Sequence, residues 1–201
     1  MREPRLRIVA ATFNKGKFEE LRTMLSKSGV EVLSLADFPE IPDVEETGAT
    51  FAENAELKAV TYAKSTGQWT LSDDSGLEVE ALGGAPGVRS ARYAGEGASD
   101  SQRVEKLLTE LTAVQTGSRA ARFVCAVALA DPEGVIRFRS EGECRGTIAE
   151  TPLGKGGFGY DPIFIPEGHS ETFGKLPQEV KDQLSHRARA LQKIIAFLAD
   201  F

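Results

Sequence analysis

The chain has 201 residues, 41% of them hydrophobic, with a formal net charge of -6 and a pI near 5.1. This length suits one domain, or one domain with a lobed outline. The acidic balance argues against a general nucleic-acid-binding protein, and no apolar run is long enough for a membrane span. No secretory leader is recognisable either. We therefore expect a single domain over residues 1–201 that works in the cytoplasm and binds any anion locally.

The first predicted strand covers residues 6–11, and an amphipathic helix follows it from near Gly16. Between them lies the polar loop Thr12-Phe13-Asn14-Lys15-Gly16-Lys17. Such a loop ahead of a helix favours a phosphate, because free backbone N–H groups and the helix dipole attract an anion there. It is not a Walker A loop, since it has one glycine and no Ser or Thr after Lys17. An equally good interpretation is that Asn14 caps the helix and both lysines are solvated.

A second strand is predicted near residues 30–35, and a second helix begins at the capping box of Thr50 and Glu53 and ends near Gly67. The residues expected to form its buried stripe are Phe51, Ala55, Ala59, Tyr62 and Ala63. Asn54 and Lys58 share another, polar face of this helix. That face could meet a ligand, although a solvated face is the commoner explanation.

Two pairs of adjacent acids are candidates for metal binding. Glu45 and Glu46 lie in the loop before the second helix, where a carboxylate can reach a metal or simply favour the helix dipole. Asp73 and Asp74 follow a short apolar strand, at a point where Ser75 and Gly76 predict a turn. If the strand stays regular, Asp73 and Asp74 point to opposite faces, so one serves the chemistry and backbone donors hold the other. Mg²⁺ typically takes one or two carboxylates from a protein. An Asx turn without any metal is the alternative interpretation.

The middle of the chain predicts a long glycine-rich loop over residues 83–95, a helix over 100–111 and a central strand over 121–130. A turn at residues 131–134 leads into a strand over 135–143 with one wet face. Cys125 and Cys144 fall in a poor register for a disulfide across this hairpin, so we expect both to be reduced.

A second glycine cluster, Gly154-Lys155-Gly156-Gly157-Phe158-Gly159-Tyr160-Asp161-Pro162, is typical of backbone that approaches a flat ligand beside a stacking ring. A mobile loop with a buried Phe is the plainer alternative. The remaining predicted elements are a short strand over residues 163–165, an element over 177–184 and a terminal amphipathic helix. Lys181, His186 and Arg187 cluster before the buried face of that helix, and we do not assign His186 as a base.

Together these segments resemble the inosine/xanthosine triphosphate pyrophosphatase family. The matching motifs run in order along the chain; they are residues 12–17, Glu45-Glu46-Thr47-Gly48 with Phe51 and Glu53-Asn54-Ala55, Asp73-Asp74-Ser75-Gly76-Leu77, Gly83-Gly84-Ala85-Pro86-Gly87, Ser90-Ala91-Arg92-Tyr93, Gly156-Gly157-Phe158-Gly159-Tyr160-Asp161-Pro162 and Ser185-His186-Arg187. One segment departs from the family, because Gly174-Lys175-Leu176 stands where an Ala-Glu-Leu run is common.

The resemblance implies an α/β fold with a long mixed central sheet flanked by helices, and two lobes with a nucleotide cleft between them. It also implies a homodimer and Mg²⁺-dependent hydrolysis of ITP, dITP or XTP to the nucleoside monophosphate and pyrophosphate. By matching position Asp74 is the catalytic base and a metal ligand, and Glu45 is a second ligand. Substrate contacts are implied for Thr12, Phe13, Asn14, Lys15, Gly16, Lys17, Ser75, Phe158, Gly159, Tyr160, Asp161, Lys181, His186 and Arg187. Asn54, Lys58 and Asp73 are further candidates.

Two other functions remain open from the sequence alone. One is a related pyrophosphatase for pyrimidine or modified nucleotides, which would use the same acids and metal. The other is a sensor that binds a triphosphate without cleaving it. The adjacent acids Asp73 and Asp74 beside a separate glutamate favour catalysis, since binding alone could rely on lysines and a helix end.

Overall fold

The computed structural model describes residues 6–114 and 117–199. One mixed sheet carries six strands in the order β2-β1-β3-β4-β5-β6. The strands are β1 (Arg7–Ala10), β2 (Glu31–Ser34), β3 (Trp69–Val79), β4 (Ala120–Ala130), β5 (Ile136–Ile148) and β6 (Phe164–Pro166). The helices are α1 (Lys15–Leu25), α2 (Phe51–Thr66), α3 (Asp100–Ala113), α4 (Gln178–Leu184) and α5 (His186–Leu198). The expected α/β class with a mixed sheet is confirmed.

The described chain divides into two compact units. Unit 1 consists of the chain up to Asp74, of Cys125–Gly142, and of the chain from Arg187 onward. Unit 2 consists of Ser75–Val124 and Glu143–His186. Strands β3, β4 and β5 contribute residues to both units.

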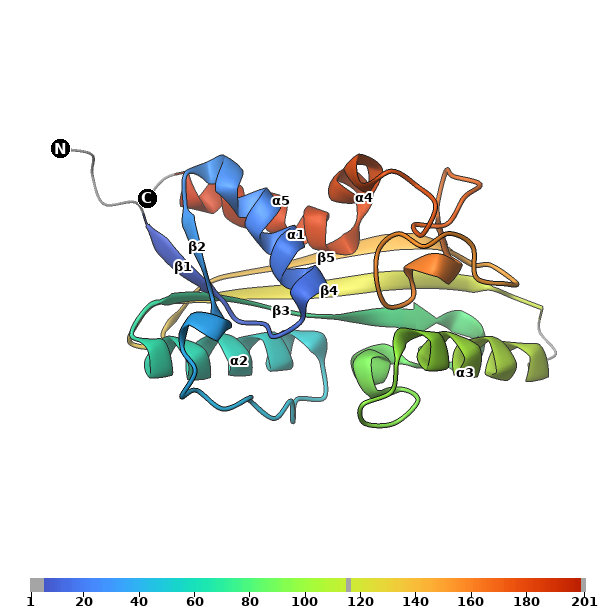
Figure 1. The fold of residues 1–201 in the computed structure, drawn as a ribbon, viewed down its shortest axis with the longest axis horizontal. Helices are drawn as coiled ribbons and strands as arrows, with labels where there is room; N and C mark the ends of the chain where they lie inside the picture. The colour runs from blue at the N-terminus through green and yellow to red at the C-terminus, as the bar shows by residue number, and fades with distance from the viewer. Residues whose placement is uncertain (1–5, 115–116, 200–201) are drawn as a thin grey trace. The chain divides into compact units, whose positions relative to one another are not determined.

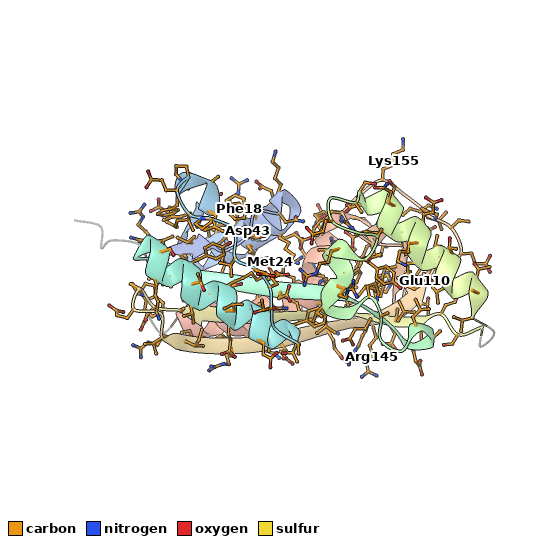
Figure 2. The ribbon with its side chains drawn as sticks, turned by 90° about the horizontal axis from the view of Figure 1, so that it is seen from below. Phe18, Met24, Asp43, Glu110, Arg145 and Lys155 are labelled. Carbon is orange, nitrogen blue, oxygen red and sulfur yellow. The ribbon has the colours of Figure 1, made fainter. Side chains whose placement is uncertain are left out.

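Unit 1 has helices on both faces of its part of the sheet, where β1 pairs in parallel with β2 and β3. Helices α1 and α5 lie on one face and α2 on the other (Figure 1). The core between these helices and the sheet includes Leu21 of α1, Leu191 of α5, and Ile8 and Leu71 of the strands, all fully buried. Met24 of α1 belongs to the same core (Figure 2). The opposite face buries Val9 and Tyr62.

Unit 2 has its core between α3 and the parts of β3, β4 and β5 that belong to this unit. Val104, Leu107 and Leu111 recur on one side of α3 and pack with Leu77, Phe123 and Phe164. This periodicity is what predicts the helix from the sequence. Antiparallel pairing of β5 with β6 closes the edge of the sheet, with Thr147 opposite Ile165.

Helix caps follow the local sequence closely. Thr50 and Glu53 form a reciprocal capping box, and Gly67 ends α2 in the left-handed conformation. A β-carbon is disfavoured in that conformation, so glycine suits the position. The expected helix boundaries here are therefore confirmed.

Two expectations about irregular segments are wrong. Strand β3 runs through Asp73–Gly76 without a turn, so the Asx-turn interpretation fails. The segment over residues 83–95 is not irregular throughout, since Gly87–Arg92 forms a 3-10 helix. Among the residues that the structure describes, no helix has the length and apolar content needed to cross a bilayer. Both cysteines are buried and free, as expected.

Candidate active site

Asp73 and Asp74 lie on β3 in unit 1 and have different partners. Because β3 stays regular, their side chains leave opposite faces of the strand, as strand geometry requires. Both are buried, with exposed fractions of 1% and 5%. Two adjacent buried acids are costly unless each is compensated. The two compensating clusters define the candidate site.

The Asp74 cluster is formed by α2 and the loop before it. Asn54 Nδ2 donates a hydrogen bond of 3.2 Å to Asp74 Oδ2, and Lys58 Nζ lies 3.5 Å from Asp74 Oδ1. Lys58 Nζ also donates to Glu46 Oε1 at 2.6 Å and to the carbonyl oxygen of Asp73 at 2.9 Å. Asn54 and Lys58 are thus buried against the acids, and the interpretation of their helix face as solvated is wrong.

The protonation of this cluster follows from burial and charge. Burial raises the pKa of Asp74, and it outweighs the lowering effect of Lys58 and Lys17; Glu46 and Asp73 add to the rise. For Lys58, burial lowers the pKa, but Asp74 and Glu46 overcome it and the pKa ends above its usual value. Lys58 therefore stays charged, while Asp74 is a stronger base than an exposed aspartate.

The Asp73 cluster joins α1, β3 and α5. Arg187 donates through Nη2 and Nε to Asp73 Oδ2 at 3.0 and 3.2 Å, and through Nη1 to Glu20. Lys17 Nζ lies 3.3 Å from the same Asp73 oxygen. Burial raises the pKa of Asp73, yet Lys17 and Arg187 outweigh burial and hold the pKa well below its usual range. Charged side chains therefore hold Asp73, in contrast to the backbone donors that the sequence predicts.

The loop before α1 has the geometry of a helix cap. Asn14 Oδ1 accepts a hydrogen bond from the backbone N–H of Lys17 at 3.0 Å, so the expected cap is confirmed. The expectation that both lysines are solvated is wrong for Lys17, which is partly buried beside Asp73. Thr12 Oγ1 accepts from the backbone N–H of Asn14 at 3.2 Å. Phe13 is 52% exposed and meets the ring of Tyr62 edge-on. Lys15 is exposed and Gly16 partly so. Binding of phosphates by this loop stays a prediction.

Unit 2 gathers the second glycine cluster around Asp161. Its Oδ2 accepts from Lys181 Nζ at 2.5 Å and from the backbone N–H of Phe158 at 2.8 Å. Lys181 Nζ also lies 4.4 Å from the centre of the partly exposed Phe158 ring. Tyr160 is buried and its hydroxyl donates to the carbonyl oxygen of Ser90 at 3.0 Å. Lys155 in the same loop is exposed and extends away from the ribbon (Figure 2).

The other sequence candidates lie as follows. Glu45 is exposed, whereas its neighbour Glu46 is partly buried and contacts Lys58. Ser75 is partly exposed and begins unit 2 on β3. His186 is buried and its ring stacks on Phe123 with an 11° interplanar angle. Lys175, at the departure from the family pattern, is exposed and pairs with Glu171 at 3.0 Å.

The residues near Asp74 fit a magnesium ion. Within the described chain no group of three or more His, Cys, Asp and Glu side chains is arranged to hold a metal. Mg²⁺ usually takes only one or two protein carboxylates and completes its octahedron with water and phosphate oxygens. Asp74 and Glu46 provide two such carboxylates. They are neighbours in this cluster, because the Lys58 nitrogen contacts both of them. An ammonium group at this point marks a place where the protein already favours positive charge.

The sequence names Glu46 beside Glu45 as a metal-binding candidate, and its contact with Lys58, twelve positions later, becomes visible only in the structure. Another acid of these clusters was missed. Glu20 was not considered, although Lys17 and Glu20 are three residues apart and share one face of α1. An acid on the inward side of an amphipathic helix, next to Leu21, is the signal that could have identified Glu20.

The family model described as the Ham1 family matches residues 8–197. The chain belongs to the Ham1 family. A relative from Geobacillus kaustophilus, named dITP/XTP pyrophosphatase, is 52% identical over 93% of this chain and 91% of its own length. A relative of the same name from Desulforamulus reducens is 48% identical over 96% of each chain.

Solved structures agree with this assignment. A HAM1 protein from Coxiella burnetii superposes with a TM-score of 0.89 at 41% identity, covering 98% of this chain and 100% of that one. The Staphylococcus aureus Ham1 protein gives a TM-score of 0.84 at 42% identity, covering 96% and 98%. The resemblance stated from the sequence motifs is thereby confirmed, and so is the α/β fold.

Proposed function

We propose that this Ham1 family protein hydrolyses deaminated purine nucleoside triphosphates, namely ITP, dITP and XTP, to the monophosphate and pyrophosphate. Relatives about half identical over nearly their whole length carry the name dITP/XTP pyrophosphatase, which supports the substrate class. The observation that carries the chemistry is Asp74, a buried carboxylate with a raised pKa beside Lys58 and Glu46. Such an enzyme would remove deaminated nucleotides from the nucleotide pool.

Asp74 acts as the base in this proposal. It takes a proton from a water molecule whose oxygen attacks the α-phosphorus. The bond from that phosphorus to the bridging oxygen breaks, and pyrophosphate leaves with the electron pair. The raised pKa of Asp74 suits this role, because a base works best when its pKa approaches the working pH. Asn54 orients the carboxylate by donating to its other oxygen.

We propose magnesium as the cofactor, held by Asp74 and an acid of the preceding loop. A bound Mg²⁺ supplies charge neutralisation at the phosphates and orients them for in-line attack. The contacts favour Glu46 for the second carboxylate, since Lys58 joins it to Asp74. Glu45, the acid inferred from the family motif, is the adjacent alternative.

Lysines compensate the charge of the triphosphate. Lys58 is charged and buried among the acids, and Lys17 lies on the first turn of α1 beside Asp73. Developing charge on leaving pyrophosphate is stabilised by such fixed cations. The first turn of α1 also offers backbone N–H groups to an anion, and residues 12–17 form the loop that leads into it.

Residues of unit 2 are proposed to recognise the base. Phe158 is the stacking candidate, because it is partly exposed and is held by a cation at one face. Hypoxanthine and xanthine carry an acceptor at the six position where adenine carries a donor, so fixed donors discriminate against ATP. Lys181 is a donor in this cluster. The guanidinium of Arg187 binds Asp73 and Glu20, which favours a role in orienting the acids.

One assay tests the proposal and its alternatives. Pyrophosphate release is measured with Mg²⁺ and ITP, XTP, GTP, ATP and UTP in parallel. We expect ITP and XTP to be fastest. In Asp74→Asn, turnover should fall by about 100-fold or more, because a general base is lost, while calorimetry still detects ITP binding. Glu40→Gln, which changes an exposed acid of unit 1, should match the parent.

The other outcomes are equally decisive. Release that is fastest from UTP would favour the pyrimidine enzyme. Binding of ITP by the parent without any release would favour the sensor. Full turnover in Asp74→Asn would remove this residue from the mechanism. The homodimer implied by the family is a separate proposal, and light scattering should then report twice the 21.7 kDa chain mass.

A further inference from the structure

Hydrogen bonds within unit 2 hold the loop that carries Phe158 on two sides. Asp161 accepts from Lys181 and from the backbone N–H of Phe158. The N–H of Gly156 donates to the carbonyl oxygen of Gly174 at 2.9 Å. Gly157 has a φ of 70°, and a β-carbon there would lie 2.1 Å from Asp161 Oδ2, so only glycine lets the chain pass this close. The loop conformation is therefore closely specified on the Asp161 side.

The opposite side of this loop is held from α3. Asp100, the first residue of α3, accepts a hydrogen bond of 2.7 Å at Oδ2 from the backbone N–H of Gly159. Its other carboxylate oxygen pairs with Arg103 one turn later. Arg103 in turn donates to the carbonyl oxygens of Ala91 and Ala98, at 2.8 and 2.6 Å. Asp100 is thus fixed by its own helix and by the segment before it.

A cavity makes this hydrogen bond important. A space of about 490 Å³ lies between α3 and the loop, with Val104 and Leu108 on the helix side and Gly154, Gly159 and Pro162 on the loop side. The cavity leaves this wall without close packing, whereas the neighbouring Tyr160 is buried in the same core cluster as Val104 and Leu107. Along this wall the Asp100 carboxylate supplies a hydrogen bond from α3 to the backbone next to Phe158.

We propose that Asp100 is a positioning residue for base recognition: it holds Gly159, and through it Phe158, at the place where the ring meets the purine. This inference rests on the proposed function, because it assigns a consequence for substrate selection. Asp100 itself touches no reacting atom. Its effect should appear in the affinity for the nucleotide base and be absent from the phosphate chemistry, whose candidate residues Asp74, Lys58 and Lys17 all belong to unit 1.

Amide hydrogen exchange tests the hydrogen bond between Gly159 and Asp100 directly and without substrate. In Asp100→Ala the Gly159 N–H loses its acceptor, and its exchange should become about tenfold faster, the effect of about 1.4 kcal/mol. Asp100→Asn keeps an oxygen that can accept, so its exchange should stay near that of the parent. Glu105→Ala removes an exposed carboxylate from the wall of the same cavity and should change nothing. Unchanged exchange in Asp100→Ala, or equal acceleration in Glu105→Ala, would overturn the proposal.

Steady-state kinetics tests the consequence. Asp100→Ala should raise KM for ITP about fivefold to tenfold, because the hydrogen bond to the Gly159 N–H is lost, and it should leave kcat within about twofold. The inhibition constant of inorganic tripolyphosphate, which has no base, should not move, and Asp100→Asn should recover most of the parent KM. A matching rise in the tripolyphosphate constant would mean general damage and would refute the proposal. If the parent does not hydrolyse ITP, the proposed function is wrong, while the exchange rates still decide whether Asp100 holds the loop.

Discussion

At the scale of single residues, the identity of the second acid decides how the metal would be held. Glu45 and Glu46 are neighbours, and a sequence motif does not say which one turns inward. The structure places Glu46 against Lys58, which also contacts Asp74, whereas Glu45 is exposed. Because both carboxylates contact one ammonium group, Glu46 is the stronger candidate to share a metal ion with Asp74.

This contrast gives a paired prediction. Glu46→Gln should raise the Mg²⁺ concentration needed for half-maximal activity by about tenfold, the effect of one lost charge-assisted contact of about 1.4 kcal/mol. Glu45→Gln, its matched neighbour, should stay within about twofold of the parent. A thermal-shift titration with Mg²⁺ in the absence of nucleotide provides a second readout. A larger effect of Glu45→Gln in both measurements would restore the assignment made from the motif.

Residues in the two acid clusters also show what a sequence can and cannot reveal about a site. Asp74, Asn54 and Lys58 could be named from the motifs, because polar residues recur there at helical and strand spacings. Their burial could not be predicted, because a polar helix face usually meets water. Here that face of α2 is buried against the acids of β3. Glu20 and Arg187 are 167 residues apart, so no local pattern announces their ion pair.

At the scale of elements, the hairpin between β4 and β5 depends on one carboxylate. Asp131 is buried at the turn, where it accepts from the backbone N–H of Val135 at 2.8 Å and from Arg137 Nε at 2.6 Å. Burial raises the pKa of Asp131, but the hydrogen bonds from Val135 and Arg137 outweigh burial and lower it. A depressed folded-state pKa means that the unfolded chain binds the proton more readily.

The stabilising effect of Asp131 should therefore be present above about pH 4, the usual aspartate pKa, and be lost as the pH falls below it. Asp131→Asn should lower Tm at about pH 7, and the difference from the parent should shrink at about pH 3. Glu133→Gln changes an exposed acid of the same turn and should show no such trend. A Tm difference that stays constant with pH would show that the charge of Asp131 contributes nothing.

Elements differ in how far local sequence specifies them. The caps of α1 and α2 follow from Asn14, Thr50 and Gly67, because capping is satisfied within a few residues. The continuation of β3 through Asp73–Gly76 does not follow, since these turn-forming residues stay extended in a strand that has a neighbour on each side and that buries Asp73 and Asp74. Tertiary contacts therefore override local propensity at the strand that carries the site.

At the scale of the whole molecule, the division into two units does not follow the breaks between elements. The chain passes from one unit to the other within β3 after Asp74, within β4 after Val124, within β5 after Gly142, and at the start of α5 after His186. Independent domains are normally joined through exposed linkers with few contacts. Here the crossings fall in regular, hydrogen-bonded elements, so neither unit is a candidate for folding alone.

We therefore expect one cooperative unfolding transition. The single tryptophan and the two cysteines allow unfolding to be followed in each unit separately. Trp69, the only tryptophan, reports on unit 1 by fluorescence, and Cys144 reports on unit 2 through thiol labelling in Cys125→Ala. The reciprocal variant, Cys144→Ala, leaves the Cys125 thiol as a second probe of unit 1 and controls for the labelling method. All three probes should give the same urea midpoint, as a two-state transition requires. If Cys144 became reactive at a clearly lower urea concentration than that at which Trp69 responds, unit 2 would unfold first, and the three shared strands would not couple the units.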